Sequence, residues 1–217
     1  MKTRFDLYIL CAGGHTSVLM DILSKSSEKV KGILDDNKDL FGKSVGDASI
    51  IGSLEDILSL DKNKLLLING LGNIPSIKNS DLNKRGMIFT NYKKLGYTFK
   101  TIISPDAIIS DRTEIQEGAQ VISSAVINAG VIIGKNSIIN TSATIDHNCK
   151  IGFNTHIAPG AVICGGVVIG DSCHIGAGSI LVPGVKISNG VVIGAGAVVL
   201  NDVSENETVV GNPAKII

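Results

Sequence analysis

The chain of 217 residues contains no tryptophan, and its aromatic residues make up only 4% of the total. With 25 glycines, this composition favours many tight turns and short strands over a helical bundle. The chain also carries no net charge, because 20 basic residues balance 20 acidic ones. It therefore has no electrostatic footprint for nucleic acid or for an anionic membrane surface, and any partner must be recognised locally.

Long apolar runs are missing as well. No window approaches the roughly 18 to 20 apolar residues of a membrane span. The apolar run near the start is interrupted by Asp6 and ends at Gly13-Gly14, which is too early for a secretory signal. The four cysteines, at positions 11, 149, 164 and 173, lack CxxC spacing and lie in apolar stretches, so we expect reduced thiols rather than disulfides. These features predict a cytoplasmic protein.

The second half of the chain repeats with a period of six. Stepping by six from Ile103 to Val199 meets an aliphatic residue every time. An α-helix would repeat at three and four, and a half-buried strand at two, so a period of six indicates a short strand and a turn. Three such units form one 18-residue coil of a triangular prism, with the aliphatic side chain inside.

This pattern resembles the hexapeptide-repeat, left-handed parallel β-helix, in which an aliphatic residue is followed by glycine, as in Ile151-Gly152, Ile169-Gly170, Ile175-Gly176 and Ile193-Gly194. The resemblance covers residues 103 to about 200 and implies left-handed coils and a homotrimer. An inert solenoid is the alternative, although such a rod needs no histidines at its corners.

The first half reads as a small α/β unit. A strand over Leu7–Cys11 leads through a glycine-rich turn into a helix ending near Ser26, and further strands are expected over Val30–Leu34 and Leu65–Ile68. A helix over Leu82–Leu95 would follow. We therefore predict a small Rossmann-like domain over residues 1–75, a connecting helix and linker over 76–102, and a β-helix with its C-terminal tail over 103–217.

Polar clusters follow each of the three strands, and the carboxyl ends of parallel strands meet at one edge of a sheet. Backbone N–H groups at the helix amino terminus favour phosphate, and an acid after the second strand can accept hydrogen bonds from ribose or base. A nucleotide is the natural occupant. A purely structural βα turn is the alternative, since the loop lacks a full GxGxxG.

Both halves together resemble bacterial UDP-4-amino-sugar N-acetyltransferases and sialic-acid O-acetyltransferases, in which a G-x-x-G-H turn precedes a β-helix. The resemblance implies transfer of acetyl from acetyl-CoA to the amine of a UDP-linked 4-amino-4,6-dideoxy sugar in surface-glycan biosynthesis. It also implies that the domain over residues 1–75 binds the nucleotide sugar and that the β-helix over 103–217 binds acetyl-CoA and is the catalytic domain. The active sites would lie between subunits of the homotrimer. Thr16 stands where glycine is common in the family. The implied substrate-binding residues are Gly13, Gly14, His15, Asp35, Asp36, Gly72, Asn73 and Asn140.

His147 is the candidate general base, because a neutral imidazole can take the proton from an attacking amine. Its surroundings, Asn140 to Asn148, resemble the family's N-T-x-x-x-I-E-H-E/D segment, in which that histidine is the base. Asp146 matches the preceding acid, whereas Asn148 replaces the following one. The group that orients the imidazole stays open between Asp146, Asn148 and a backbone carbonyl. The alternative is that His147 is an ordinary surface histidine without a catalytic role.

The 18-residue step stacks Gly165 above His147, which makes the Gly165 N–H a candidate oxyanion donor. The same arithmetic stacks His156 under His174 and aligns residues 176–178 with 194–196. These small residues would form a trough for the pantetheine arm of acetyl-CoA, or they merely fill tight corners. The predicted acetyl-CoA-binding residues are His156, Gly165, Ala177, Gly178, Ala195, Gly196 and Lys215.

Two further readings stay open. Sialic-acid O-acetylation fits the same pattern, but free sialic acid would not need a nucleotide pocket. A carbonic-anhydrase-type enzyme also uses this prism and takes three histidines per zinc site across an interface. We predict no metal, and the metal content of the purified protein separates the acetyltransferase from the carbonic-anhydrase-type enzyme.

Overall fold

The computed structural model describes residues 5–26, 28–73 and 83–217. The chain divides into two compact units, one of Met1–Gly72 with Met87–Lys100 and one of Asn73–Gly86 with Thr101–Ile217. The predicted boundary between residues 75 and 76 lies outside the described residues. The two expected folds, α/β and left-handed parallel β-helix, are both confirmed.

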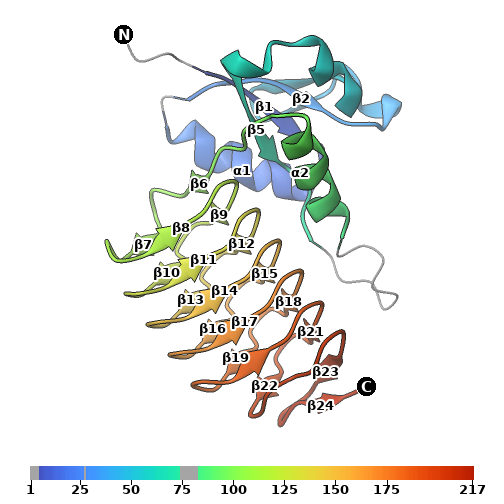
Figure 1. The fold of residues 1–217 in the computed structure, drawn as a ribbon. Coiled ribbons are helices and arrows are strands. Elements are labelled where there is room, and N and C mark those ends of the chain that lie inside the picture. Colours follow the sequence, from blue (N-terminus) through green and yellow to red (C-terminus); the bar gives the residue numbers. More distant parts are fainter. Residues whose placement is uncertain (1–4, 27, 74–82) are drawn as a thin grey trace. The chain divides into compact units, whose positions relative to one another are not determined.

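The first unit contains a five-stranded sheet in the order β3-β4-β2-β1-β5. Figure 1 labels β1, β2 and β5 of this sheet. Strands β4, β2, β1 and β5 run parallel, and the edge strand β3 pairs antiparallel with β4. The sequence analysis did not predict the β3–β4 hairpin. The strands are β1 (Asp6–Leu10), β2 (Val30–Leu34), β3 (Ser44–Val45), β4 (Ala48–Gly52) and β5 (Leu65–Asn69).

Two helices and three short 3-10 turns accompany this sheet. They are α1 (Gly14–Ser24), α2 (Lys84–Lys94), η1 (Lys38–Leu40), η2 (Leu54–Ser59) and η3 (Lys62–Lys64). The start predicted for the second helix, at Leu82, lies outside the described residues, and the described helix ends one residue before Leu95. Within the described ranges, neither helix is long and apolar enough to span a bilayer.

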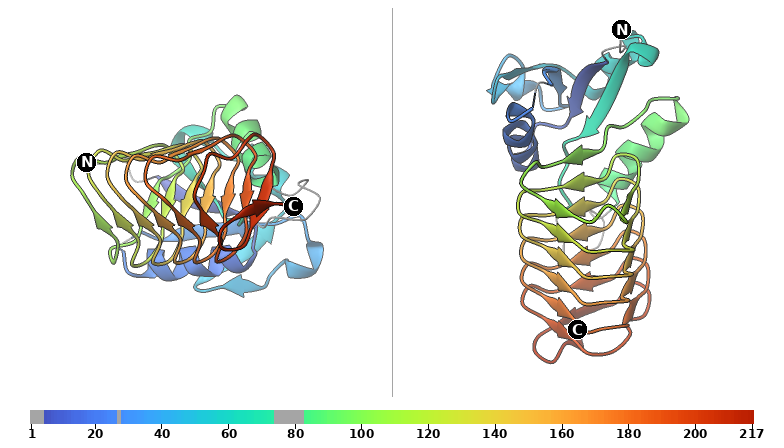
Figure 2. Two further views of the ribbon diagram at one scale, coloured as in Figure 1. Left: turned by 90° about the horizontal axis from the view of Figure 1, so that it is seen from below. Right: turned by 90° about the vertical axis from the view of Figure 1, so that its left-hand side faces the viewer.

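The second unit is a stack of three-stranded coils (Figures 1 and 2). Before the last coil, each strand pairs in parallel with the strand 18 residues further on, as in Ile145 with Ile163. In the last coil the spacing is shorter, since Val192 pairs with Thr208. The first sheet contains β7 (Ile108–Ile109), β10 (Val126–Ile127), β13 (Thr144–Ile145), β16 (Val162–Ile163), β19 (Ile180–Leu181) and β22 (Val198–Val199). The second contains β8 (Glu114–Ile115), β11 (Ile132–Ile133), β14 (Lys150–Ile151), β17 (Val168–Ile169) and β20 (Lys186–Ile187).

The third sheet contains β6 (Ile102–Ile103), β9 (Gln120–Val121), β12 (Ile138–Ile139), β15 (His156–Ile157), β18 (His174–Ile175), β21 (Val192–Ile193), β23 (Thr208–Val210) and β24 (Lys215–Ile216). The last two form an antiparallel hairpin. We call the turns from the first to the second sheet the first edge, those from the second to the third the second edge, and those from the third back to the first the third edge.

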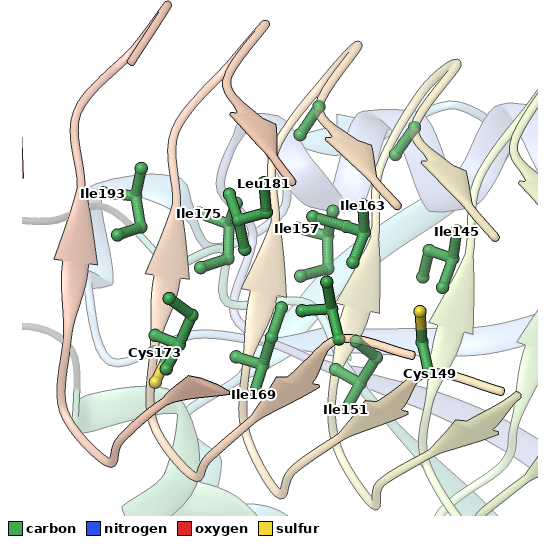
Figure 3. Close-up of a cluster of buried hydrophobic side chains, with 14 of the residues drawn as sticks. Ile145, Cys149, Ile151, Ile157, Ile163, Ile169, Cys173, Ile175, Leu181 and Ile193 are labelled. Carbon is green, nitrogen blue, oxygen red and sulfur yellow. The ribbon is translucent and has the colours of Figure 1, made fainter. Parts of the chain in front are cut away.

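The aliphatic residues of the six-residue repeat fill the inside of the prism (Figure 3). Ile145 and Ile163, for example, are both completely buried. Two cysteines, Cys149 and Cys173, join this core as free thiols. The exceptions lie in the first coil of the stack, where Ile103 is 47% exposed and Ile109 and Ile115 are only partly buried.

The corners explain the abundance of glycine and asparagine. Every sixth residue from 118 to 196 has a positive φ, and each of these positions holds Gly, Asn or Ser. A left-handed backbone costs glycine nothing and asparagine little, whereas most side chains resist it. Asn148 occupies one of these corners, with φ of 59°. The backbone therefore gives a physical reason for asparagine at the position where the resemblance led us to expect an acid.

Candidate active site

His147 lies on the first edge, in the turn between β13 and β14, and its side chain is 61% exposed. The imidazole covers the glycine of the next coil. A β-carbon added at Gly165 would lie 2.6 Å from Nε2 and 2.7 Å from Cε1 of His147. The predicted stacking is therefore confirmed, and only a residue without a side chain leaves room for this ring.

The backbone of Gly165 is partly free to bind a ligand. Its carbonyl accepts a hydrogen bond from Gly184 N–H at 3.0 Å, and the next amide, Gly166 N–H, donates to the His147 carbonyl at 2.9 Å. Within the described residues, the Gly165 N–H itself donates no hydrogen bond. A donor beside the imidazole is thus available to a developing oxyanion.

Asp146 bonds the backbone of His147 and lies beside its ring. Its Oδ1 accepts from the His147 N–H at 2.7 Å and from Asn128 Nδ2 at 2.9 Å, while its Oδ2 lies 4.0 Å from His147 Nε2. The hydrogen bond from Asn128, followed by that from the His147 amide, holds the pKa of the Asp146 carboxyl below its ordinary value. Asp146 is therefore a charged carboxylate beside the imidazole at neutral pH.

Asn148 contacts the other side of the ring, with Nδ2 3.3 Å from His147 Nδ1. The structure thus brings both Asp146 and Asn148 to the imidazole. Asn128, 18 residues before Asp146, was missed by the sequence analysis, although the coil length alone would have pointed to it.

The small residues predicted for the pantetheine trough align as expected, but on the third edge. Gly196 N–H donates to the Ala177 carbonyl at 2.9 Å, and Ala177, Gly178, Ala195 and Gly196 are all exposed. A β-carbon at Gly178 or Gly196 would meet no atom within 4 Å. In one chain this trough and His147 therefore belong to different edges of the prism.

His156 and His174 are neighbours on the outer face of the third sheet, with their rings edge to face and the ring centroids 5.0 Å apart. His156 is 8% exposed, and its Nδ1 donates to the Asn73 carbonyl at 2.9 Å. Its Nε2 lies 3.0 Å from Nδ2 of Asn140. The Oδ1 of the same Asn140 side chain accepts from the Thr141 N–H at 2.8 Å. Since the Asn73 carbonyl can only accept and the Asn140 NH₂ can only donate, His156 is a neutral, fixed tautomer.

Burial lowers the pKa of His174 to about 4, against the smaller opposing effect of the Asn73 backbone. His174 is therefore uncharged at neutral pH. Among the described residues, no three His, Cys, Asp or Glu side chains are grouped as a metal site would require.

Lys215 lies at the far end of the prism, in β24. It borders a pocket of about 280 Å³ between the last turn of the first edge and the final hairpin. Asp202 and Glu207 also line this pocket. The Asp202 carboxylate accepts from the Lys186 N–H at 2.8 Å, so it fixes the last coil.

In the first unit, the strand ends converge as predicted. Asp35 Oδ2 accepts from the Ala12 N–H at 2.7 Å, which joins the end of β2 to the glycine-rich turn. Asp36 Oδ1 accepts from the Leu54 N–H at 3.0 Å, at the start of η2. A β-carbon at Gly72 would lie 3.5 Å from the His15 β-carbon, so the turn after β5 approaches α1.

Thr16 ties these loops together, because its hydroxyl donates to the Cys11 carbonyl at 2.6 Å and lies 3.2 Å from that of Gly70. Gly13 and Gly14 are exposed at the amino terminus of α1, where no side chain caps the helix. Asn73 belongs to the second unit and is described above with His156.

Comparisons with known proteins agree with this geometry. Residues 6–79 match the PglD N-terminal domain family, and residues 148–183 and 166–201 match the bacterial transferase hexapeptide family. The acetyltransferase domain of PglB from Neisseria gonorrhoeae FA1090, solved with acetyl coenzyme A, is 32% identical with a TM-score of 0.90. The match covers 99% of this chain and 100% of that one. The chain belongs to the nucleotide-amino-sugar acetyltransferase family.

Two further solved structures are similar to nearly the whole chain. PerB from Caulobacter crescentus, in complex with CoA and GDP-perosamine, is 29% identical with a TM-score of 0.88, and the match covers 98% of this chain and 97% of that one. WeeI from Acinetobacter baumannii AYE is 25% identical with a TM-score of 0.83, covering 98% and 100%. No match is found among curated protein sequences. The family predicted from the sequence is confirmed.

Proposed function

We propose that this acetyltransferase moves an acetyl group from acetyl-CoA to the amine of a nucleotide-linked 4-amino sugar, with His147 as general base. The observation that carries the proposal is the imidazole of His147 lying over the bare backbone of Gly165, with the Gly165 N–H available. A proton acceptor and an oxyanion donor next to each other are the two groups that acyl transfer from a thioester requires.

In the proposed reaction the amine nitrogen attacks the thioester carbon while Nε2 of His147 takes the amine proton. This step requires the tautomer with its hydrogen on Nδ1, so the side-chain amide of Asn148, whose Nδ2 lies 3.3 Å from Nδ1 in the structure, turns its oxygen toward Nδ1. The carbonyl oxygen becomes an oxyanion, which the Gly165 N–H stabilises. Collapse breaks the carbon–sulfur bond, and the proton passes from Nε2 to the leaving thiolate. The charged carboxylate of Asp146, 4.0 Å from Nε2, stabilises the imidazolium that exists between the two proton transfers.

We further propose that the working enzyme is a homotrimer. The outer face of the first sheet is aliphatic apart from Thr144, and Ile108 and Ile180 on it are 68% and 40% exposed. This face lies between the first and third edges. Three prisms that turn it toward a common axis would bring the first edge of one chain against the third edge of the next.

This arrangement would bring together the groups near His147 and the small-residue trough, which lie on different edges of the prism in one chain. His147, Asp146 and Gly165 would come from one subunit, and the trough of Ala177, Gly178, Ala195 and Gly196 from its neighbour. Small residues with open space above them suit a long, flexible pantetheine arm. Lys215, at the pocket at the end of the first edge, would meet the phosphates of acetyl-CoA.

The side chains of His156 and Asn140 complete the proposed acetyl-CoA and acceptor sites. His156 has both ring nitrogens engaged, so we assign it a binding and positioning role rather than proton transfer. Asn140, held by His156 and Thr141, would face the acceptor.

For the acceptor, the exposed amino terminus of α1 at Gly13, Gly14 and His15 suits the phosphates of a nucleotide. Asp35 and Asp36 follow β2, and the free lone pairs of their carboxylates would accept from ribose or base. Gly72 leaves room beside His15. The base of the nucleotide stays a prediction: the resemblance suggests UDP, whereas PerB was solved with GDP-perosamine.

A surface-glycan role and a cytoplasmic location are also proposals. All four cysteines are free thiols, as expected in a reducing compartment.

The test is to mix purified enzyme and acetyl-CoA with a UDP-linked 4-amino sugar, a GDP-linked 4-amino sugar or sialic acid, and to follow thiol release. The expected result is acetylation of a nucleotide amino sugar, verified by product mass, and its loss in His147→Ala. Acetylation of sialic acid alone would replace this proposal with O-acetylation.

A further inference from the structure

Asn128 lies on the first edge, one coil before Asp146, and both side chains point out of the prism. Asn128 Nδ2 donates to Asp146 Oδ1 at 2.9 Å, and the His147 N–H donates to the same oxygen at 2.7 Å. Two donors on one oxygen fix the rotation of the carboxylate. The other oxygen, Oδ2, then faces the imidazole, 4.0 Å from Nε2.

We propose that Asn128 is a positioning residue that acts on His147 through the carboxylate of Asp146. The inference rests on the proposed function, in which His147 is the general base. The Asn128 side chain donates to the Asp146 carboxylate, whereas the Asn128 backbone bonds to Thr113 and Ile145.

The need for such a residue follows from exposure. The side chains of His147 and Asp146 are 61% and 42% exposed, so water competes for the carboxylate, and an unrestrained aspartate would sample several rotamers. Stabilisation of a transient charge is most effective when the stabilising group is already in place before the charge forms. Asn128 supplies that restraint from a rigid coil.

A purely structural staple between coils is the competing explanation, and the prism offers a matched example. On the second edge, Asn189 Oδ1 accepts from the Asp171 N–H at 2.8 Å, again across 18 residues. Asn189 is exposed, as Asn128 is, but its edge carries none of the proposed catalytic groups. Asn189→Ala is therefore the control variant.

The kinetic test is a double-mutant cycle with Asn128→Ala, Asp146→Ala and the double variant. Loss of one net hydrogen bond predicts a fall in kcat of about three- to tenfold for Asn128→Ala, with the KM of both substrates unchanged. In the Asp146→Ala background, Asn128→Ala should have no further effect, because the group that it positions is gone. Asn189→Ala should keep the wild-type kcat.

Equal losses from Asn128→Ala in both backgrounds, a loss confined to KM, or the same loss in Asn189→Ala would each overturn the proposal.

An NMR titration of the Asp146 carboxyl provides a second readout that needs no acceptor substrate. Because Asn128 is the main cause of the lowered pKa of Asp146, Asn128→Ala should raise that pKa toward its ordinary value. An unchanged titration would refute the positioning contact, whereas an enzyme inactive on amino sugars with the expected titration would refute only the proposed function.

Discussion

Replacing Gly165 with alanine tests the central geometry directly. The added β-carbon would lie 2.6 Å from Nε2, 2.7 Å from Cε1 and 3.2 Å from Cδ2 of His147. Ordinary van der Waals contact begins near 3.4 Å, so the ring must move by roughly 1 Å or rotate away. The φ of Gly165 is not in the left-handed region, so alanine itself causes no backbone strain.

A misplacement of about 1 Å in a reacting group can lower the rate by about 10²-fold. We therefore expect kcat of Gly165→Ala to fall by about two orders of magnitude, while the melting temperature stays close to that of the native protein. The ring is exposed, so moving it costs little folding energy. Steady-state kinetics and thermal unfolding of the same preparations measure both quantities.

The control is Gly190→Ala on the second edge, where φ is +68° and the new methyl group would meet the side chain of Asn206. Left-handed strain of about 1 kcal/mol should lower its stability while leaving turnover intact. Gly165→Ala should thus lose activity but keep its stability, and Gly190→Ala should lose stability but keep its activity. Full activity in Gly165→Ala would refute the placement of His147 Nε2 at the reacting centre.

The remaining predictions concern the histidines and one strained residue. His147→Ala should lower kcat by about 10² to 10⁴ while calorimetric binding of acetyl-CoA is preserved; preserved turnover would mean that the base lies elsewhere. His15→Ala should mainly raise the KM for the nucleotide sugar, and an unchanged KM would argue against an acceptor site in the first unit. His174 is neutral when folded, with a pKa of about 4 against 6.5 for the free side chain, so the unfolded chain binds its proton first as pH falls. Its contribution to stability is therefore complete above about pH 6.5 and is lost by pH 4, by at most about 3 kcal/mol; urea unfolding at pH 7 and 4.5 should show a smaller difference in His174→Phe. Cys11 has φ of 75°, so Cys11→Gly should stabilise the protein by up to about 1 kcal/mol in the same denaturation assay, and a clear loss of stability would contradict the strain.

Several features of the site could be read from the sequence because the prism repeats every 18 residues. The register of Gly165 over His147 and of His174 over His156 follows from that number alone. The βα entrance and its strands were also predictable from local patterns, with Val30–Leu34 matching β2 at both ends. The β3–β4 hairpin was missed, because β3 has only two residues and the sequence of β4, Ala48–Gly52, has no regular alternation of apolar and polar residues.

Residue roles that depend on side-chain direction required the tertiary structure. Asp35 was expected to face a nucleotide, yet its oxygens also hold the backbone of the glycine-rich turn and of Asn37. His156 was expected beside acetyl-CoA, and only the folded chain shows both of its nitrogens engaged.

The period of six in this sequence determined the coils, the inward aliphatic residues and which positions stack, since a strand-turn repeat has one way to bury its apolar side. The same period places His147 and the small-residue trough on different edges of the prism. The tertiary structure decided which groups face the imidazole and which atoms engage His156 and Asp35. Repetition fixes the distance along the stack, but the hydrogen bonds and exposure of each outward side chain depend on neighbours from other coils and other segments, which no local pattern specifies.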